Sequence, residues 1–246
     1  MFKAEIKADT LKTLVNVIST VVDEVKIAIH PDSLGIRAID PARVAMINID
    51  VSKEAFVSFE ADEGEMGFDL DKIKNIIKLA GPGDTILMEH DPNQGRLSMT
   101  IGNIIRRMSL VDTNGMNDPS VPPLELGTKV QINADLLQKG MRATETIDSD
   151  HIKMEADSEG FTLSCDNDLD FASLKVPASE LKALEAQQHV ASSYSRDYFS
   201  NIVKSIPGNV PVSLQFDPDY PIKLLFELSD GNAHASYLLA PRIEGE

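Results

Sequence analysis

A helix-start signal recurs four times along this chain at nearly equal spacing. Asp9, Asp71, Asp135 and Asp197 are separated by 62, 64 and 62 residues, and an apolar residue follows each Asp at the second and the sixth position. That spacing places the apolar residues on one stripe of a helix. We expect each Asp to accept backbone N–H groups at the helix start and to meet the positive end of the helix dipole. The pattern predicts four repeat units of about 60 residues, in which these acids have a structural task.

After each predicted helix, the hydrophobic period changes from 3.6 residues to 2. A unit made of one helix and a meander of about three strands has too little core to be stable alone, so the units should pair. The sequence therefore predicts an α+β fold with two pseudo-repeated domains. The alternating apolar residues that predict the strands are Ile47, Ile49 and Val51, then Leu97, Met99 and Ile101, then Ile152, Met154, Ala156, Phe161, Leu163 and Cys165, and finally Val212, Leu214 and Phe216.

The strongest linker candidate lies between the second and the third unit. Residues 116–127 contain three prolines, which favour an extended segment on the surface. We therefore predict an N-terminal domain over residues 1–115, a connector over 116–128 and a C-terminal domain over 129–246.

The charges are separated along the chain. The chain holds 23 Lys and Arg against 39 Asp and Glu, a net charge of −16, which repels phosphate at long range. The helix windows 9–22, 71–80, 135–147 and 196–206 nevertheless carry eight basic and five acidic residues, or +3, which leaves −19 for the rest. Because these windows hold almost no Lys–Glu pairs four residues apart, helices that face a polyanion are favoured over solvated helices of mixed charge. The eight cations are Lys12, Lys72, Lys74, Lys78, Lys139, Arg142, Arg196 and Lys204.

No motif for catalysis or for a resident metal stands out. The five histidines are far apart and lack metal-ligand spacings. Cys165 alternates with Phe161 and Leu163, which indicates a buried strand residue more than a nucleophile. A single cysteine makes no internal disulfide, so we expect a reducing, intracellular location. The sequence predicts no enzyme and no cofactor.

Two segments imitate ligand loops. Gly81–Thr85 is rich in glycine, but it lacks the Lys-Ser/Thr ending of a phosphate loop and follows a helical pattern, so we expect a helix end and a turn. Asp166, Asp168 and Asp170 have calcium-loop spacing, but Phe171 stands where the loop needs Gly. We expect a polar hairpin there.

Two segments resemble a known family. Leu34–Met46, with the sequence LGIRAIDPARVAM, and Tyr237–Glu244, with the sequence YLLAPRIE, resemble the sliding clamps called proliferating cell nuclear antigen. The similarity extends to the repeat, the basic helices and the central linker. The compact connector and the lack of a basic localisation run resemble archaeal more than eukaryotic clamps, so the expected location is cytoplasmic and nucleoid-associated, or nuclear if the protein is eukaryotic.

The resemblance implies a homotrimeric ring with helices around a central hole and sheets outside. Double-stranded DNA would pass through the hole without sequence preference, and the eight helix cations would face it. The family is non-catalytic: its members tether DNA polymerase and other replication and repair enzymes, and a clamp loader opens the ring.

The resemblance also assigns two protein interfaces. Subunits would join through the edge strands Ile104–Leu110 and Phe171–Val176. Arg106 and Arg107 on the first strand could form ion pairs with Glu145 and Asp148 near the second, or all four side chains could be solvated, and the sequence favours neither alternative. The implied interface residues are Ile104, Arg106, Arg107, Met108, Leu110, Glu145, Asp148, Phe171, Leu174 and Val176. The implied pocket for a short partner peptide consists of Ile39, Arg43, Val44, Leu124, Leu126, Pro221, Leu238, Ala240, Pro241, Arg242 and Ile243.

Two other functions stay open from the residues alone. A metal-dependent hydrolase would use the acidic cluster between Asp148 and Asp170. A stand-alone peptide-binding module would be a monomer indifferent to DNA.

Overall fold

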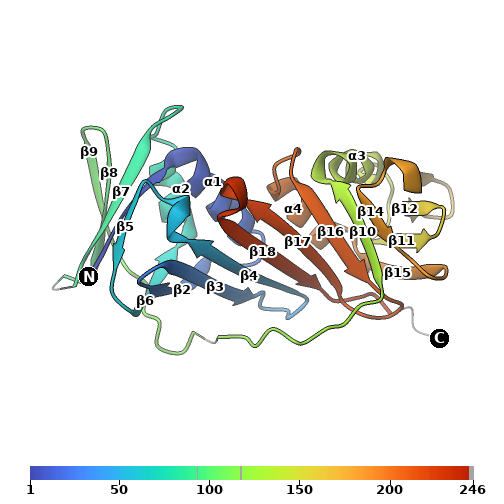
Figure 1. The fold of residues 1–246 in the computed structure, drawn as a ribbon, viewed down its shortest axis with the longest axis horizontal. Coiled ribbons are helices and arrows are strands. Elements are labelled where there is room, and N and C mark those ends of the chain that lie inside the picture. The colour runs from blue at the N-terminus through green and yellow to red at the C-terminus, as the bar shows by residue number, and fades with distance from the viewer. Residues whose placement is uncertain (93, 117, 244–246) are drawn as a thin grey trace. The chain divides into compact units, whose positions relative to one another are not determined.

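The chain forms two compact units. The computed structural model describes residues 1–92, 94–116 and 118–243. Unit 1 consists of residues 1–121 and 227–235, and unit 2 consists of residues 122–226 with the chain from Ser236 onward. Each unit combines two helices with antiparallel strands, which confirms the predicted α+β class (Figure 1).

Unit 1 contains two groups of antiparallel strands and two helices in contact with each other (Figure 1). The helices are α1 (Ala8–Ile18) and α2 (Leu70–Ile77). One sheet has the order β5 (Ser58–Ala61), β1 (Phe2–Lys7), β7 (Thr85–Asp91), β8 (Arg96–Ile101) and β9 (Ile104–Ser109). The second group has the order β4 (Ala45–Ser52), β3 (Ser33–Ile39), β2 (Glu24–His30) and β6 (Gly64–Asp69), and the short 3-10 helix η1 (Lys53–Ala55) follows β4.

Both repeats of unit 1 contribute to one core. Leu14 of α1 and Ile73 of α2 line the same apolar interior as Phe2 of β1, Ile36 of β3 and Phe68 of β6, and all five are buried. Complete burial of an aliphatic or Phe side chain contributes about 1.5–3 kcal/mol to stability. The two helical stripes and the inward faces of both strand groups are therefore stabilised together.

Unit 2 repeats this arrangement. Its helices α3 (Ala134–Thr144) and α4 (Arg196–Ser205) contact each other. A four-stranded sheet has the order β13 (Phe171–Pro177), β12 (Gly160–Asp166), β11 (His151–Asp157) and β15 (Val190–Ser195). The other group has the order β14 (Ala183–Glu185), β10 (Thr128–Asn133), β16 (Pro211–Phe216) and β17 (Ile222–Leu228). The 3-10 helices η2 (Ala178–Glu180) and η3 (Ser229–Gly231) follow β13 and β17, and β18 (Ala233–Leu239) completes the chain's strands in the described residues.

The helix starts differ in one respect from the prediction. Each recurring Asp is the second residue of its helix, so it lies in the first turn and not at the N-cap. Among the four helices of the described chain, the N-cap side chain accepts a hydrogen bond only at α2, where Asp69 Oδ1 lies 3.0 Å from the backbone nitrogen of Lys72. That bond lowers the pKa of Asp69. The recurring acids thus complement the helix dipole, as expected, and Asp135 Oδ1 accepts the N–H of Leu136 at 2.8 Å, but none of the four is an N-cap residue.

The two segments that imitate ligand loops are turns, as predicted. Gly81–Thr85 connects α2 to β7, and Asp84 Oδ2 accepts the N–H of Gly81 at 2.8 Å. In the hairpin between β12 and β13, Asn167 Oδ1 accepts the N–H groups of Leu169 at 2.9 Å and Asp170 at 2.6 Å. Local hydrogen bonds of this kind explain the clustered acids and amides.

Two glycines of β6 provide a matched test of this packing. A Cβ atom on Gly67 would lie 2.4 Å from the carbonyl oxygen of Val111, whereas one on Gly64 would meet nothing within 4 Å. We expect Gly67→Ala to destabilise the protein by about 1–3 kcal/mol, because backbone atoms must move, and Gly64→Ala to change stability by less than about 0.5 kcal/mol. Urea denaturation measures both, and an equal loss in the two variants would contradict the close approach.

Candidate nucleic-acid and partner interfaces

The eight predicted DNA-facing cations all reach the surface of their helices. Lys74 and Arg196 are partly buried, and the other six are exposed. In unit 1, Lys12, Lys74 and Lys78 line a groove of about 400 Å³ between α1 and α2. In unit 2, Arg196 and Lys204 line a smaller groove of about 250 Å³ between α3 and α4. The polar side of each helix pair is therefore hollowed and carries cations.

Four of these cations are neutralised by nearby carboxylates. The nitrogen–oxygen distances are 3.0 Å for Lys72–Asp69, 3.2 Å for Lys74–Asp71, 3.4 Å for Arg196–Asp197 and 2.9 Å for Lys204–Glu145. Arg196 Nη1 also donates to the carbonyl oxygen of Ile147 at 2.5 Å. The pair between Lys204 and Glu145 joins α4 to the residue that directly follows α3, so Glu145 already has a partner inside its own chain.

The remaining four cations, Lys12, Lys78, Lys139 and Arg142, are exposed and have no acidic side chain in ion-pair contact in the described part of the chain. Lys78 Nζ donates to Asn75 Oδ1 at 3.2 Å, a contact that leaves its charge uncompensated. Because exposed ion pairs are weak, the paired cations are still accessible to a polyanion, but the unpaired ones carry the larger part of the helix charge.

Both strands predicted to join subunits lie at the edges of their sheets. β9 is the last strand beyond β8, and β13 is the last strand beyond β12. The N–H of Leu110 donates to Gly95 at 3.3 Å, and hydrogen bonding alternates along an antiparallel strand, so the N–H of Ser109 points away from β8. At the two ends of β13, the N–H of Asn167 donates to the carbonyl oxygen of Asp170, and the N–H of Ala178 donates to that of Glu159. By the same alternation, the N–H of Ser173 points away from β12.

The side chains of these edge strands divide into exposed and core residues. Ile104 is 44% exposed and Phe171 67% exposed, as an interface requires. The side chains of Met108 and Val176 are buried within their own unit, so in the predicted interface these residues would contribute through the backbone of their strands. Ile105, 56% exposed, is a residue that the sequence analysis did not select. The sequence signal for Ile105 is the consecutive apolar pair Ile104 and Ile105, which interrupts the alternation of apolar and polar residues along the strand.

The other predicted interface residues also lie at or near these edges. Arg106 and Arg107 are exposed on β9, and Leu110 is half-buried directly after it. Leu174 is half-buried, and its Cδ2 atom lies 2.9 Å from the position that a Cβ on Gly140 of α3 would occupy. Asp148 is exposed, and its carbonyl oxygen accepts a hydrogen bond from Asn167 at 3.4 Å.

In unit 1, the predicted pocket residues lie on a loop organised by Asp40. The buried Asp40 carboxylate accepts the N–H groups of Ala42 at 3.0 Å, and of Val44 and Ala45 at 2.7 Å each. Ile39 and Val44 are half-buried, and Arg43 is exposed with a φ of 58°. Asp40, which lies within the segment Leu34–Met46, therefore shapes the loop between β3 and β4, a role that the sequence analysis did not assign.

In unit 2, the C-terminal segment runs beside the free edge of β15. Pro241 forms a bridge with Tyr194, and the N–H of Arg242 donates to Ser193 at 2.7 Å. Arg242 Nη2 lies 2.7 Å from Asp150 Oδ2, and Ile243 is 71% exposed. Ala240 and Pro241 are half-buried, and Glu244 of the predicted C-terminal motif lies outside the described residues.

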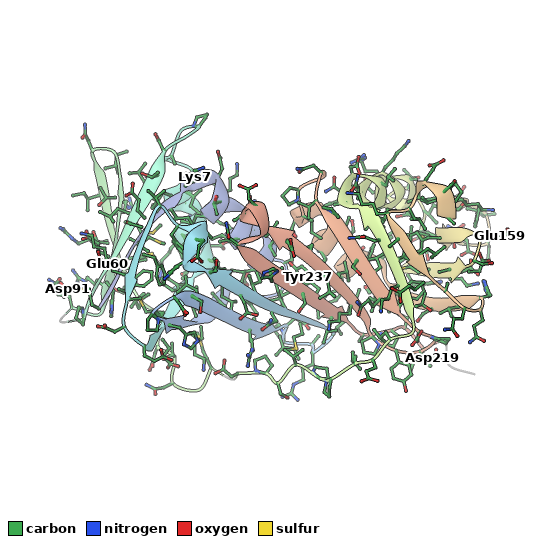
Figure 2. All side chains as sticks on the ribbon, viewed as in Figure 1. Lys7, Glu60, Asp91, Glu159, Asp219 and Tyr237 are labelled. Carbon is green, nitrogen blue, oxygen red and sulfur yellow. The ribbon has the colours of Figure 1, made fainter. Side chains whose placement is uncertain are left out.

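Two other predicted anchors in unit 2 have buried side chains. Leu126 and Leu238 are buried, so their side chains belong to the core, whereas Leu124 is half-buried. Pro221 is half-buried and follows Tyr220, an exposed aromatic residue that the sequence analysis missed. Tyr220 lies after the turn that joins β16 to β17, in which Asp219 is labelled in Figure 2.

Cys165 has the properties of a core residue. It is buried, its Sγ donates to the carbonyl oxygen of His151 at 3.4 Å, and burial raises the pKa of its thiol. Among the described residues, no group of three or more His, Cys, Asp or Glu side chains is arranged to hold a metal ion. No helix in the described ranges is long and apolar enough to cross a membrane.

Comparisons with known proteins show which family this chain resembles in sequence and in fold. Residues 1–112 match the family model described as proliferating cell nuclear antigen, N-terminal domain. The DNA polymerase sliding clamps of Methanocella arvoryzae and Methanococcoides burtonii are each 37% identical over 247 residues, with all of both chains covered. The structure of A. fulgidus PCNA with the C-terminal region of FEN-1 bound is similar, with a TM-score of 0.93 and 29% identity over 100% of both chains. PCNA from Thermococcus kodakaraensis shares the fold, with a TM-score of 0.90 at 22% identity over 98% of this chain and 100% of that chain.

Proposed function

We propose that this chain, which belongs to the family of DNA polymerase sliding clamps, performs the clamp function as a closed ring of three copies around duplex DNA. The family is non-catalytic, which disfavours a metal-dependent hydrolase, and its archaeal members imply an intracellular location. The observation that carries the proposal is the cationic polar side of each helix pair in a chain of net charge −16.

Cations on helices suit sequence-independent contact with DNA. Flexible Lys and Arg side chains attract phosphates without reading base edges, so the ring could move along the duplex. Exposed Lys12, Lys78, Lys139 and Arg142 would supply most of this attraction, with the four paired cations in support. The acidic remainder of the chain would discourage DNA from binding elsewhere.

The proposed ring closes through the two open sheet edges. An edge strand with outward N–H groups is completed by pairing with another strand, and a head-to-tail contact between two different edges gives a ring where the rotation between successive copies closes. β9 and β13 offer such edges, each with an exposed apolar side chain, Ile104 or Ile105 on β9 and Phe171 on β13. The proposed domains remain 1–115 and 129–246, joined by the connector 116–128.

Partners would bind the ring through a short peptide with apolar anchors. A. fulgidus PCNA binds the C-terminal region of FEN-1 in its solved structure. By similarity, we expect DNA polymerase, the clamp loader and other replication and repair enzymes to use the surface near Leu124, Pro221 and the segment 240–243. Each bound partner would gain effective concentration at the DNA.

The first prediction concerns ring closure. Ser109→Pro and Ser173→Pro should each abolish or strongly reduce trimers, because proline removes an N–H that points out of the sheet toward the proposed partner strand. Ser109→Ala and Ser173→Ala keep the N–H and should stay trimeric. Analytical ultracentrifugation at low micromolar concentration measures the masses. Trimeric proline variants would contradict this interface, and a monomeric wild type would favour the stand-alone peptide-binding module.

The second prediction separates the two classes of helix cations. Changing Lys12, Lys78, Lys139 and Arg142 together to Gln should reduce retention on circular DNA severalfold, because it removes the uncompensated charges. The matched variant, with Lys72, Lys74, Arg196 and Lys204 changed to Gln, should lose less. A loading assay on primed circular DNA compares them, with trimer mass as the control. If the first variant is retained on circular DNA as well as the wild type, the four unpaired cations do not face the DNA.

The third prediction concerns the peptide surface. Leu124→Ala and Ile243→Ala should each weaken binding of a peptide from the FEN-1 C-terminal region by about 1–2 kcal/mol, because each removes apolar contact area. Leu79→Ala changes a side chain that is 47% exposed after α2 and should leave the affinity unchanged. Isothermal titration calorimetry measures the peptide affinity of all three variants. Unchanged affinity in the first two would show that the peptide binds elsewhere.

A further inference from the structure

Lys26 fixes the start of the connector to unit 1. Its side chain is only 13% exposed, and its Nζ atom lies 2.9 Å from Asp118 Oδ2, 3.4 Å from the carbonyl oxygen of Met116 and 3.7 Å from Glu65 Oε2. The hydrogen bond with Asp118 raises the pKa of Lys26, so this charge persists at neutral pH. A largely buried, fully protonated ammonium group with three oxygen neighbours is held in place by all of them.

The residues before this contact are fixed as well. The N–H of Val111 donates to Gly67 at 2.9 Å, and Thr113 Oγ1 lies 2.6 Å from Glu65 Oε1. Gly67 and Glu65 belong to β6, and Lys26 belongs to its neighbour β2. The chain from Val111 to Asp118 is therefore attached to one sheet region at several points.

Asp217 fixes the other end of the connector in unit 2. Its carboxylate accepts the N–H of Gly127 at 2.8 Å and the N–H and hydroxyl of Thr128 at 3.2 and 3.3 Å. Asp217 lies in the same turn as Asp219, which Figure 2 labels. Buried Leu126 anchors the chain immediately before these bonds.

The span between the two attachments, residues 119–125, is stiff and mostly exposed. Three of its seven residues are proline, which fixes φ and favours an extended backbone. Val121 is 37% exposed, and Leu124 is half-buried. Within the described chain, the backbone of this span makes no hydrogen bond. Its free N–H and C=O groups are thus available to an extended peptide.

We infer that Lys26 and Asp217 are positioning residues that pre-order the 119–125 span for a partner peptide. The inference rests on the proposed function, which places the peptide near Leu124. A span attached at both ends samples fewer conformations, so less entropy is lost when a peptide orders it. Neither residue needs to touch the peptide, since each acts on the ends of the span.

The expected effect is modest. Without the Lys26 contacts, the next attachment is Thr113, so the free span grows from seven residues to twelve, 114–125. Each doubling of loop length changes the equilibrium constant of loop closure by roughly a factor of three, so we expect Lys26→Met to weaken peptide binding about twofold to threefold. The double variant with Asp217→Ala should lose more than either single variant.

Calorimetric titration with a synthetic peptide of the FEN-1 C-terminal region tests the inference on the full-length trimer. Lys26→Met and Asp217→Ala should lose affinity through a less favourable binding entropy, and Lys26→Arg, which can still donate to Asp118, should restore it. Lys3→Met, which breaks an exposed pair of 3.0 Å with Glu89, is the matched control and should bind normally.

The outcomes separate this inference from the proposed function. If the wild-type trimer does not bind the peptide, the proposed partner surface is wrong. If the wild type binds, but both variants keep its affinity and binding entropy, the positioning roles are wrong and the surface stands. A loss in Lys26→Met that Lys26→Arg does not restore would also overturn the role assigned to Lys26.

Discussion

The fold depends on the pairing of two repeats around one core. A helix stripe such as Leu11, Leu14 and Val15 is apolar along one side only, and the neighbouring strands are apolar on one face. About 60 residues cannot bury both surfaces, so each unit needs two helices and two groups of strands. Once α1 and α2 share a core, their polar sides necessarily lie next to each other. The same holds for α3 and α4.

This constraint also leaves features that the core does not use. The polar sides of the helix pairs carry cations, and β9 and β13 lie at open edges of their sheets. A polyanion and a second copy of the chain are the partners that such features suit. The connector differs, because its two ends are held chiefly by polar contacts of Lys26 and Asp217, with the buried side chain of Leu126 as its apolar anchor.

The sequence predicts those parts of the fold that depend on periodicity. The four helices and the strands after them follow from the spacing of apolar residues, whereas the two edge strands come from the family resemblance. The turns at Gly81–Thr85 and Asp166–Asp170 follow from the way these segments depart from ligand-loop motifs. Features that depend on tertiary contacts are missed. The resemblance assigns Met108, Val176 and Leu126 to interfaces, but their side chains are buried within this chain, and Glu145 pairs with Lys204 of α4. No spacing rule reveals the contact of Lys26 with Asp118, because 92 residues separate them.

The central claim is that the two open edges close three copies of the chain into one ring. Native mass spectrometry of the wild-type protein tests this claim most directly, since it counts chains without assuming which residues join them. The account predicts one dominant species with the mass of three chains of 26.9 kDa each. A species with the mass of a single chain, across the micromolar range and at physiological salt, would contradict it.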